Sequence, residues 1–228
     1  MDKINRLIFW DIDGTLLHCG SNGRKALNRT FLEMYGVTDA LGKSPVGASM
    51  DSMLLGGIMK TFGIDPKDFP RITQHYKGVL KEILDQDKNK RVLPGVIPIL
   101  EAIDKHPQAI NALLTSNLRV GAEAKLSSVG LNKYFQIGGF GDDIGEKWDA
   151  AVKCIEMAEK QYNTLFPKDQ IYLIGDSCYD ITSSKKIGIK SIAVATGWTD
   201  ISTLQACEPD YFFPDLSDTE KILEIIKV

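Results

Sequence analysis

The chain has 228 residues, of which 43% are hydrophobic and 25% charged, and its formal net charge is −3. This composition is ordinary for a soluble globular protein, and the length allows one large domain or a domain with an insert. The sequence has no basic footprint for nucleic acid, and no apolar run approaches the roughly 20 residues that span a bilayer. We therefore expect a globular protein without nucleic-acid or membrane partners.

The cysteines and the N-terminus indicate a cytoplasmic protein. The four cysteines lie far apart and form no C-x-x-C pair, which suits a reducing compartment better than a disulfide framework or a zinc site. The three histidines also lack the spacing of metal ligands. Met1-Asp2-Lys3 leads directly into an apolar segment, a pattern without a signal peptide. The cysteines are Cys19, Cys154, Cys178 and Cys207.

The stretch LIFWDIDGTL, residues 7–16, joins an apolar run to two carboxylates. Residues 7–10 have the pattern of a strand buried on both faces, and Asp11 and Asp13 follow where Gly14 permits a turn. Ligands of open parallel sheets bind beyond the carboxyl ends of the strands, and two carboxylates this close need a metal ion, a proton or another cation. The alternative is a turn in which both side chains accept hydrogen bonds from backbone amides. This stretch alone leaves both interpretations open.

Residues 18–91 have a helical pattern without a strand. A first helix with a polar cap at residues 21–22 ends near Gly36, and Ser49 is a candidate cap for a second helix. The pair at 65–66 is Asp-Pro and predicts the start of a third helix, because proline is favoured at the first helical position. The apolar side chains of that helix recur with helical spacing: Ile72, Tyr76, Val79, Leu80, Ile83 and Leu84.

From residue 93 onward, strands alternate with helices, which implies a parallel sheet with right-handed crossovers. We therefore predict an α/β fold with a Rossmann-like parallel sheet and an inserted all-α segment. The core takes residues 1–17 and 92–228, and residues 18–91 form the insert over the sheet edge that carries the aspartates. The last helix begins with a capping box of Ser217 and Glu220. The later strands are predicted at residues 110–114, 135–137, 171–174, 192–194 and 211–213.

Polar residues follow two of these later strands at the point where each strand ends. Because parallel strands end at one edge of a sheet, these residues should meet Asp11 and Asp13 there. Four carboxylates at one site are too costly unless a cation compensates, and hard oxygen ligands favour Mg²⁺ completed by waters and a phosphate. The residues expected at this edge are Asp11, Asp13, Thr115, Ser116, Asn117, Asp176 and Asp180.

The same edge carries groups that suit a phosphate. The hydroxyl of Thr115, the amide of Asn117 and free backbone N–H groups in the Gly14 turn are donors for phosphate oxygens. Lys147, at the start of a helix, can supply the positive charge that a transferring phosphoryl group needs, and Lys153 is the alternative lysine nearby. Each of these residues is also common in an ordinary turn or on a solvated surface. Their order and spacing as a set favour a site.

The motifs together resemble those of the haloacid dehalogenase (HAD) superfamily, in particular phosphatases of the phosphoglycolate phosphatase-like type with a helical C1 cap. The resemblance covers essentially the whole chain and departs at the third motif, where the usual Lys-Pro pair is Lys147-Trp148. The motif positions are D-x-D-G-T-L at 11–16, then Thr115, then Lys147, and finally Asp176 with Asp180.

This resemblance implies a Mg²⁺-dependent phosphatase that hydrolyses a small phosphorylated metabolite, a phosphomonoester. Asp11 would attack phosphorus to form an aspartyl-phosphate, and Asp13 would protonate the leaving alcohol and then activate water. Thr115 and Lys147 would hold the phosphoryl oxygens while the insert closes over the substrate. The implied Mg²⁺ ligands are Asp11, the backbone carbonyl of Asp13, Asp176, and Asp180 as a ligand or as an orienting residue.

Two alternatives stay open. Asp13 disfavours the dehalogenase and phosphonate-cleaving branches of the superfamily. Sugar phosphomutases keep both aspartates and are the first alternative. Their fourth motif usually begins Glu-Asp-Ser, where this chain has Gly-Asp-Ser at 175–177. A catalytically inactive binding or regulatory protein on this fold would be expected to lack a motif residue. Arg24 is a candidate substrate contact, or else caps the first helix of the insert.

Overall fold

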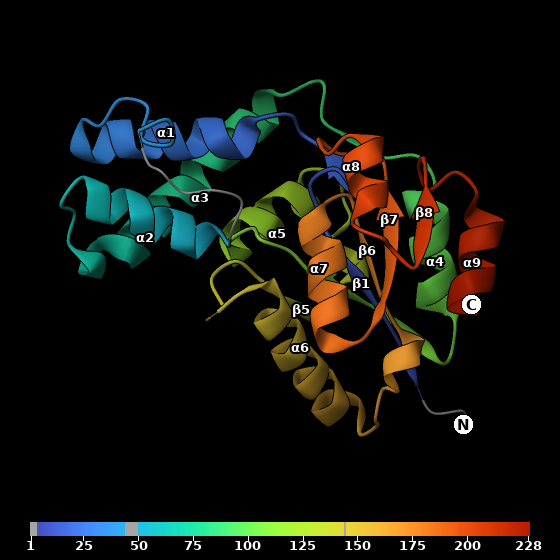
Figure 1. The fold of residues 1–228 in the computed structure, drawn as a ribbon. Helices are drawn as coiled ribbons and strands as arrows, with labels where there is room; N and C mark the ends of the chain where they lie inside the picture. Colours follow the sequence, from blue (N-terminus) through green and yellow to red (C-terminus); the bar gives the residue numbers. More distant parts are fainter. Residues whose placement is uncertain (1–3, 44–49, 144) are drawn as a thin grey trace.

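The computed structural model describes residues 4–43, 50–143 and 145–228 and contains a six-stranded sheet beside a group of helices (Figure 1). Neighbouring strands run parallel, in the order β5-β4-β1-β6-β7-β8. The predicted α/β fold with a parallel sheet is thereby confirmed. The strands are β1 (Arg6–Trp10), β4 (Ala109–Leu114), β5 (Gly138–Gly139), β6 (Ile171–Gly175), β7 (Lys190–Val194) and β8 (Tyr211–Phe213).

The sheet is covered by helices on both faces, with α4 and α9 on one side and α6 and α7 on the other (Figure 1). Ile8 and Trp10 of β1 belong to one hydrophobic cluster, and Leu7 and Phe9 belong to a second. Because both faces are buried, the strand needs no polar alternation. The helices of this part are α4 (Val96–Lys105), α5 (Arg119–Ser127), α6 (Lys147–Tyr162), α7 (Cys178–Ile187), α8 (Ile201–Ala206) and α9 (Thr219–Ile226), with 3-10 turns η2 (Asn132–Tyr134) and η3 (Lys168–Gln170).

The segment between β1 and α4 is helical, as predicted, and lies to one side of the sheet (Figure 1). Two short strands that were not predicted, β2 (Leu17–His18) and β3 (Arg91–Val92), pair antiparallel and join the two connecting segments. They lie at the two points where the sequence predicts the division between core and insert. The helices of this segment are α1 (Asn22–Tyr35), α2 (Asp51–Thr61) and α3 (Phe69–Gln86), with the 3-10 turn η1 (Pro66–Asp68).

Local signals explain several of the helix ends. Gly36 ends α1 in the left-handed region with φ 68°, where glycine carries no Cβ penalty. Asp65 caps η1, because its side chain accepts from Lys67 N. The predicted cap Ser49 lies outside the described residues, and the structure describes α2 from Asp51.

Two local predictions are wrong. The strand predicted at 135–137 is instead β5, whose two glycines pair with the end of β4. A Cβ on Gly138 would lie 2.8 Å from Leu113 Cβ, so the close packing of this strand requires glycine. Because glycine is rare in strands, strand propensity does not predict β5. At the last helix, Asp218 rather than Ser217 is the cap, since the Asp218 side chain accepts from Lys221 N.

The cysteine prediction is also wrong for one pair. Cys178 and Cys207 form a disulfide across a Cα–Cα distance of 5.8 Å, whereas Cys19 and Cys154 are free and buried. The fold brings the start of α7 next to the end of α8, which a sequence separation of 29 residues does not reveal. The cysteines therefore lend no support to a reducing compartment.

Across the described residues, no helix combines the length and the apolar character needed to cross a membrane.

Candidate active site

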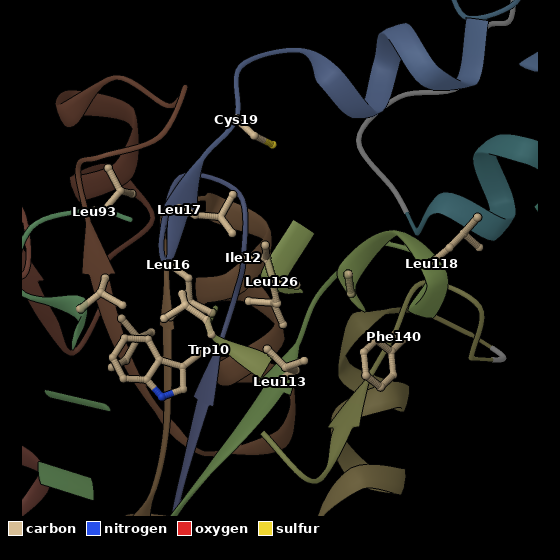
Figure 2. Packing of buried hydrophobic residues seen from close by; sticks show 14 of the residues in the cluster. Trp10, Ile12, Leu16, Leu17, Cys19, Leu93, Leu113, Leu118, Leu126 and Phe140 are labelled. Atoms are coloured by element: carbon tan, nitrogen blue, oxygen red, sulfur yellow. The ribbon is translucent and has the colours of Figure 1, made fainter. Parts of the chain in front are cut away.

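The turn after β1 lies against the loop that follows β6 and carries Asp11 and Asp13. Its apolar residues Ile12 and Leu16 are fully buried and pack in the cluster with Trp10 (Figure 2). Gly14 takes φ +81°, and a Cβ there would lie 2.6 Å from Asp176 Oδ2. Only glycine therefore lets the turn approach this carboxylate. The buried side chains of Ile12 and Leu16 thus fix the turn on the hydrophobic core, and Asp11 lies at the edge of the sheet.

Lys147 is buried beside Asp11. Its Nζ donates to Asp11 Oδ1 at 3.0 Å and to Asp180 Oδ1 at 2.5 Å. The second oxygen of Asp180 accepts from the backbone N and the hydroxyl of Ser177, at the start of α7. Although burial opposes a charge on Lys147, the two carboxylates raise its pKa. The side chain is therefore a fixed cation between two elements of the core.

Of the two candidate lysines, only Lys147 reaches the aspartates. It is the first residue of α6, where a capping box between Glu146 and Asp149 fixes the start of the helix. Lys153, almost two turns further along, has a side chain that is 57% exposed and pairs with Asp143.

Three carboxylates beside Lys147 fit a divalent cation. Oxygens of Asp11, Asp176 and Asp180 lie within 4.8 Å of one another. Burial raises the pKa of Asp11 to about 6, even though Lys147 opposes the shift. Burial, with the charges of Asp11 and Asp180, raises the pKa of Asp176 to about 8. A cation among these hard oxygen donors would favour their ionised forms, and such donors suit Mg²⁺.

The hydrogen bonds distinguish the three carboxylates. Both oxygens of Asp180 accept from protein donors. In the described part of the chain, the side chain of Asp176 accepts one hydrogen bond, from Thr15 Oγ1 at 3.3 Å. The side chain of Asp176 is therefore more available to a metal ion, whereas the contacts of Asp180 suit it to orient Lys147.

Asp13 lies in a different environment from Asp11. Its Oδ2 accepts from Asn117 Nδ2 at 2.8 Å and from Lys125 Nζ at 2.5 Å. Its Oδ1 lies 3.5 Å from the Cys19 sulfur. Asn117 Nδ2 also donates to Thr115 Oγ1 at 2.8 Å, which places the residues after β4 next to the turn after β1. Burial alone would raise the pKa of Asp13, but Lys125 and the hydrogen bonds lower it below its usual value.

Lys125 is the residue of this site that the sequence reasoning missed. It lies on α5, where its neighbours Ala122 and Leu126 are buried, and is itself 4% exposed. Burial opposes its charge, but chiefly Asp13 raises its pKa. The sequence offers one signal for it: a lysine among the apolar positions on the buried face of a predicted helix. Because buried charges are normally paired, such a lysine is expected to contact a carboxylate.

The helical segment contacts the core close to this site. At the start of α2, Asp51 N donates to Ser116 O at 2.9 Å, and the Asp51 side chain accepts from Leu118 N at 3.2 Å. On α3, Tyr76 is 1% exposed and packs against Gly121 of α5. Ser116 thus connects the two parts of the chain through its backbone carbonyl.

Arg24 is not brought to the site by any described contact. It is exposed in the first turn of α1, and among the described residues it has no hydrogen bond or ion pair with the aspartates or lysines above. The neighbouring Gly23 is the residue of that turn that faces the site, because a Cβ there would lie 3.5 Å from Lys125 Nζ.

Comparison with known proteins identifies the family. Residues 8–194 match the model of haloacid dehalogenase-like hydrolases. The chain is 24% identical to a phosphoglycolate phosphatase from Agrobacterium fabrum, over 94% of this chain and 90% of the relative. It is 22% identical to pyrophosphatase PpaX from Oceanobacillus iheyensis, over 93% of this chain and 94% of the relative. The crystal structure of a hydrolase from Pseudomonas syringae has the same fold, with a TM-score of 0.67 at 19% identity, covering 96% of this chain and 98% of that one. Because the family model spans most of the chain, including the turn after β1 and the loops after β4 and β6, this chain belongs to the haloacid dehalogenase-like hydrolases.

Proposed function

We propose that the chain is a Mg²⁺-dependent phosphatase that hydrolyses a small phosphomonoester through an aspartyl-phosphate on Asp11. The observation that carries this proposal is the pairing of each aspartate of the turn with its own buried lysine, Lys147 for Asp11 and Lys125 for Asp13. Each carboxylate therefore has its own charged partner, and the roles of nucleophile for Asp11 and of acid and base for Asp13 are those that the resemblance to the family implies.

The reaction has two steps at phosphorus. In the first, an oxygen of Asp11 bonds to phosphorus, the bond to the leaving oxygen breaks, and Asp13 gives that oxygen a proton. In the second, Asp13 takes a proton from water, the water oxygen bonds to phosphorus, and the bond to Asp11 breaks. Inorganic phosphate is released and both aspartates return to their starting states. Proton transfer of this kind typically contributes about 10²–10⁴-fold to the rate.

The groups after β4 and at the start of α6 are proposed to hold the phosphoryl oxygens. Thr115 Oγ1 accepts from Asn117 N and Nδ2, so its own proton is available for a phosphoryl oxygen. Lys147 supplies positive charge from the other side, and backbone N–H groups of the Gly14 turn can add further donors.

The carboxylates of Asp11 and Asp176 and the backbone carbonyl of Asp13 are the proposed ligands of Mg²⁺, with Asp180 as an orienting residue. When bound, the ion would neutralise the carboxylates and stabilise negative charge on the phosphoryl group.

A small phosphorylated metabolite is the proposed substrate class. The names of the two relatives, phosphoglycolate phosphatase and pyrophosphatase, support it. We further propose that residues 18–91 act as a cap over a core of residues 1–17 and 92–228, because the segment meets the core beside the catalytic turn. Among the residues that the structure describes, Arg24 has no contact that supports a role in substrate binding.

The nucleophile is tested with Asp11→Asn and the matched control Asp104→Asn, which changes an exposed aspartate of α4. We expect wild-type enzyme with Mg²⁺ to release phosphate from p-nitrophenyl phosphate, and a chelator to stop the reaction. Asp11→Asn should lose at least about 10³-fold in kcat, and Asp104→Asn should keep the wild-type rate.

Acid-quenched wild-type enzyme should carry a phosphoryl group on the peptide that contains Asp11, detected by mass spectrometry. Full activity of Asp11→Asn, or a phosphoryl group on another residue, would contradict the assignment. Isomerisation of a hexose phosphate in place of phosphate release would favour a phosphomutase.

A further inference from the structure

We infer that Lys125 is a positioning residue for proton transfer by Asp13: it clamps Oδ2 together with Asn117, so that Oδ1 is the atom that exchanges the proton with the leaving group. This inference rests on the proposed phosphatase function. It adds a second lysine to the site, with a task distinct from that of Lys147.

The contacts around Asp13 leave its two oxygens in different situations. Oδ2 accepts from Lys125 Nζ at 2.5 Å and from Asn117 Nδ2 at 2.8 Å. In the described part of the chain, the only partner of Oδ1 is the Cys19 sulfur at 3.5 Å, a weak donor. A carboxyl group with Oδ2 held by two donors carries its transferable proton on Oδ1.

Lys125 also determines the orientation of Asn117. Its ammonium can only donate, and Nζ lies 2.6 Å from Asn117 Oδ1. The carbonyl of the amide must therefore face Lys125, and the NH₂ group must face Asp13 and Thr115. One ammonium thus fixes both hydrogen bonds to Oδ2, its own and that of the asparagine.

The side chain of Lys125 is enclosed by three helices. A Cβ on Gly23 of α1 would lie 3.5 Å from Nζ and 3.6 Å from the Tyr76 hydroxyl oxygen. Three elements, α1, α3 and α5, therefore close around this side chain, which is 4% exposed. Since a buried ammonium is costly unless it is paired, its contacts with Asp13 and Asn117 are what hold it there.

A purely structural role for Lys125 is the competing explanation, and the acidity of the leaving group separates the two. A good leaving group departs as an anion and needs little protonation, whereas a poor one depends on the acid. The probes are p-nitrophenyl phosphate and benzyl phosphate, two aryl-bearing esters whose leaving groups differ strongly in acidity. A loss of folded protein would lower both rates equally.

The test compares kcat/KM for both esters in wild type, Lys125→Met and the control Lys153→Met, which changes an exposed lysine. Removing the ammonium takes away the main cause that lowers the pKa of Asp13, and this change by itself would favour protonation of the poor leaving group. A loss in Lys125→Met that is at least tenfold larger with benzyl phosphate than with p-nitrophenyl phosphate is therefore the result expected of lost positioning, and Lys153→Met should match wild type with both. Asn117→Ala, which removes the second donor to Oδ2, should show the same selective loss. It tests the clamp independently if Lys125→Met does not fold.

Equal losses with both esters in Lys125→Met and in Asn117→Ala would overturn the positioning role while leaving the phosphatase proposal intact. Wild-type enzyme that turns over neither ester would overturn the phosphatase proposal, and the role of Lys125 with it.

Discussion

At the residue scale, Asp11 and Asp13 are two positions apart yet meet different partners. Asp11 lies 3.0 Å from Lys147, which also holds Asp180, and burial raises its pKa. Asp13 lies against Lys125, and its pKa is lowered despite burial. Proximity in sequence therefore does not produce similar carboxylates, because each lysine reaches only one of them.

Replacing Lys147 should affect catalysis far more than replacing its neighbour on α6. Lys147→Met removes the charge beside Asp11 and Asp180, so we expect kcat for p-nitrophenyl phosphate to fall at least about 10²-fold. Lys153→Met should leave kcat unchanged, because that side chain is 57% exposed and pairs only with Asp143 among the described residues. A larger loss in Lys153→Met would show that the motif lysine is misassigned.

Asp51, the first residue of α2, should make stability depend on pH. Burial raises its pKa to about 6, against the opposing charge of Lys125. The folded state thus binds a proton more tightly than the unfolded state, so this carboxyl costs stability as the pH rises from about 4 to about 6. Asp51→Asn removes that cost and can still accept from Leu118 N. Above pH 6.5 it should raise the free energy of unfolding by on the order of 1 kcal/mol.

The measurement is denaturant unfolding of wild type and Asp51→Asn at several pH values. The difference between the two proteins should shrink towards zero near pH 4, where Asp51 is protonated in the folded state. A difference that is constant with pH would show that Asp51 is not the titrating group.

At the element scale, α7 connects the site to the edge of the core. Ser177 and Asp180 form a capping box at its start, so the residue that orients Lys147 also fixes the helix end. Cys178, which follows Ser177, forms a disulfide with Cys207 at the end of α8. The disulfide thus ties α8 to the first turn of α7, the turn that also carries Asp180.

Breaking this disulfide should lower stability. Closing a loop between residues 29 apart is worth about 3–4 kcal/mol in the chain-entropy model. We expect the Tm of Cys207→Ser to fall by roughly 10 °C relative to the oxidised wild type. A dithiol reductant should lower the Tm of wild type and leave that of Cys178→Ser/Cys207→Ser unchanged. A wild-type Tm that does not respond to reductant would mean that the bond contributes nothing.

At the scale of the whole molecule, the helical segment and the sheet meet along α3 and α5 and at the start of α2. Tyr76 packs where α5 has Gly121, whose missing side chain makes room for the ring. Nearby, Lys125 lies under the same segment and contacts Asp13. A shift of the segment on α5 would therefore change the surroundings of Lys125 and, through it, of Asp13.

Filling the space at Gly121 should weaken catalysis by shifting the helical segment. A Cβ there would lie 3.1 Å from the Tyr76 hydroxyl oxygen, so Gly121→Val forces α3 away from α5. We expect kcat/KM to fall roughly 10–100-fold. Gly78→Val, on α3, is the matched control, since a Cβ at Gly78 meets nothing within 4 Å. Comparable losses in both variants would attribute the effect to helix propensity instead.

The sequence by itself determined the longer strands, most of the helices and the edge of the sheet where the site lies. The apolar run before Asp11, the alternation of strands and helices after residue 93, and the polar residues after β4 and β6 are local patterns. Local patterns suffice here because burial on both faces and helix capping depend on neighbours in the chain. The placement of Lys147 at a helix start could be predicted for the same reason.

The tertiary structure alone decided which side chains meet. Lys125 and Asp13 are 112 residues apart, and Lys147 and Asp11 are 136 apart. The partner of Cys178 and the glycine strand β5 likewise depend on helices and strands packed from elsewhere in the chain. Such contacts leave no periodicity in the sequence, because they are set by how the elements cross in space.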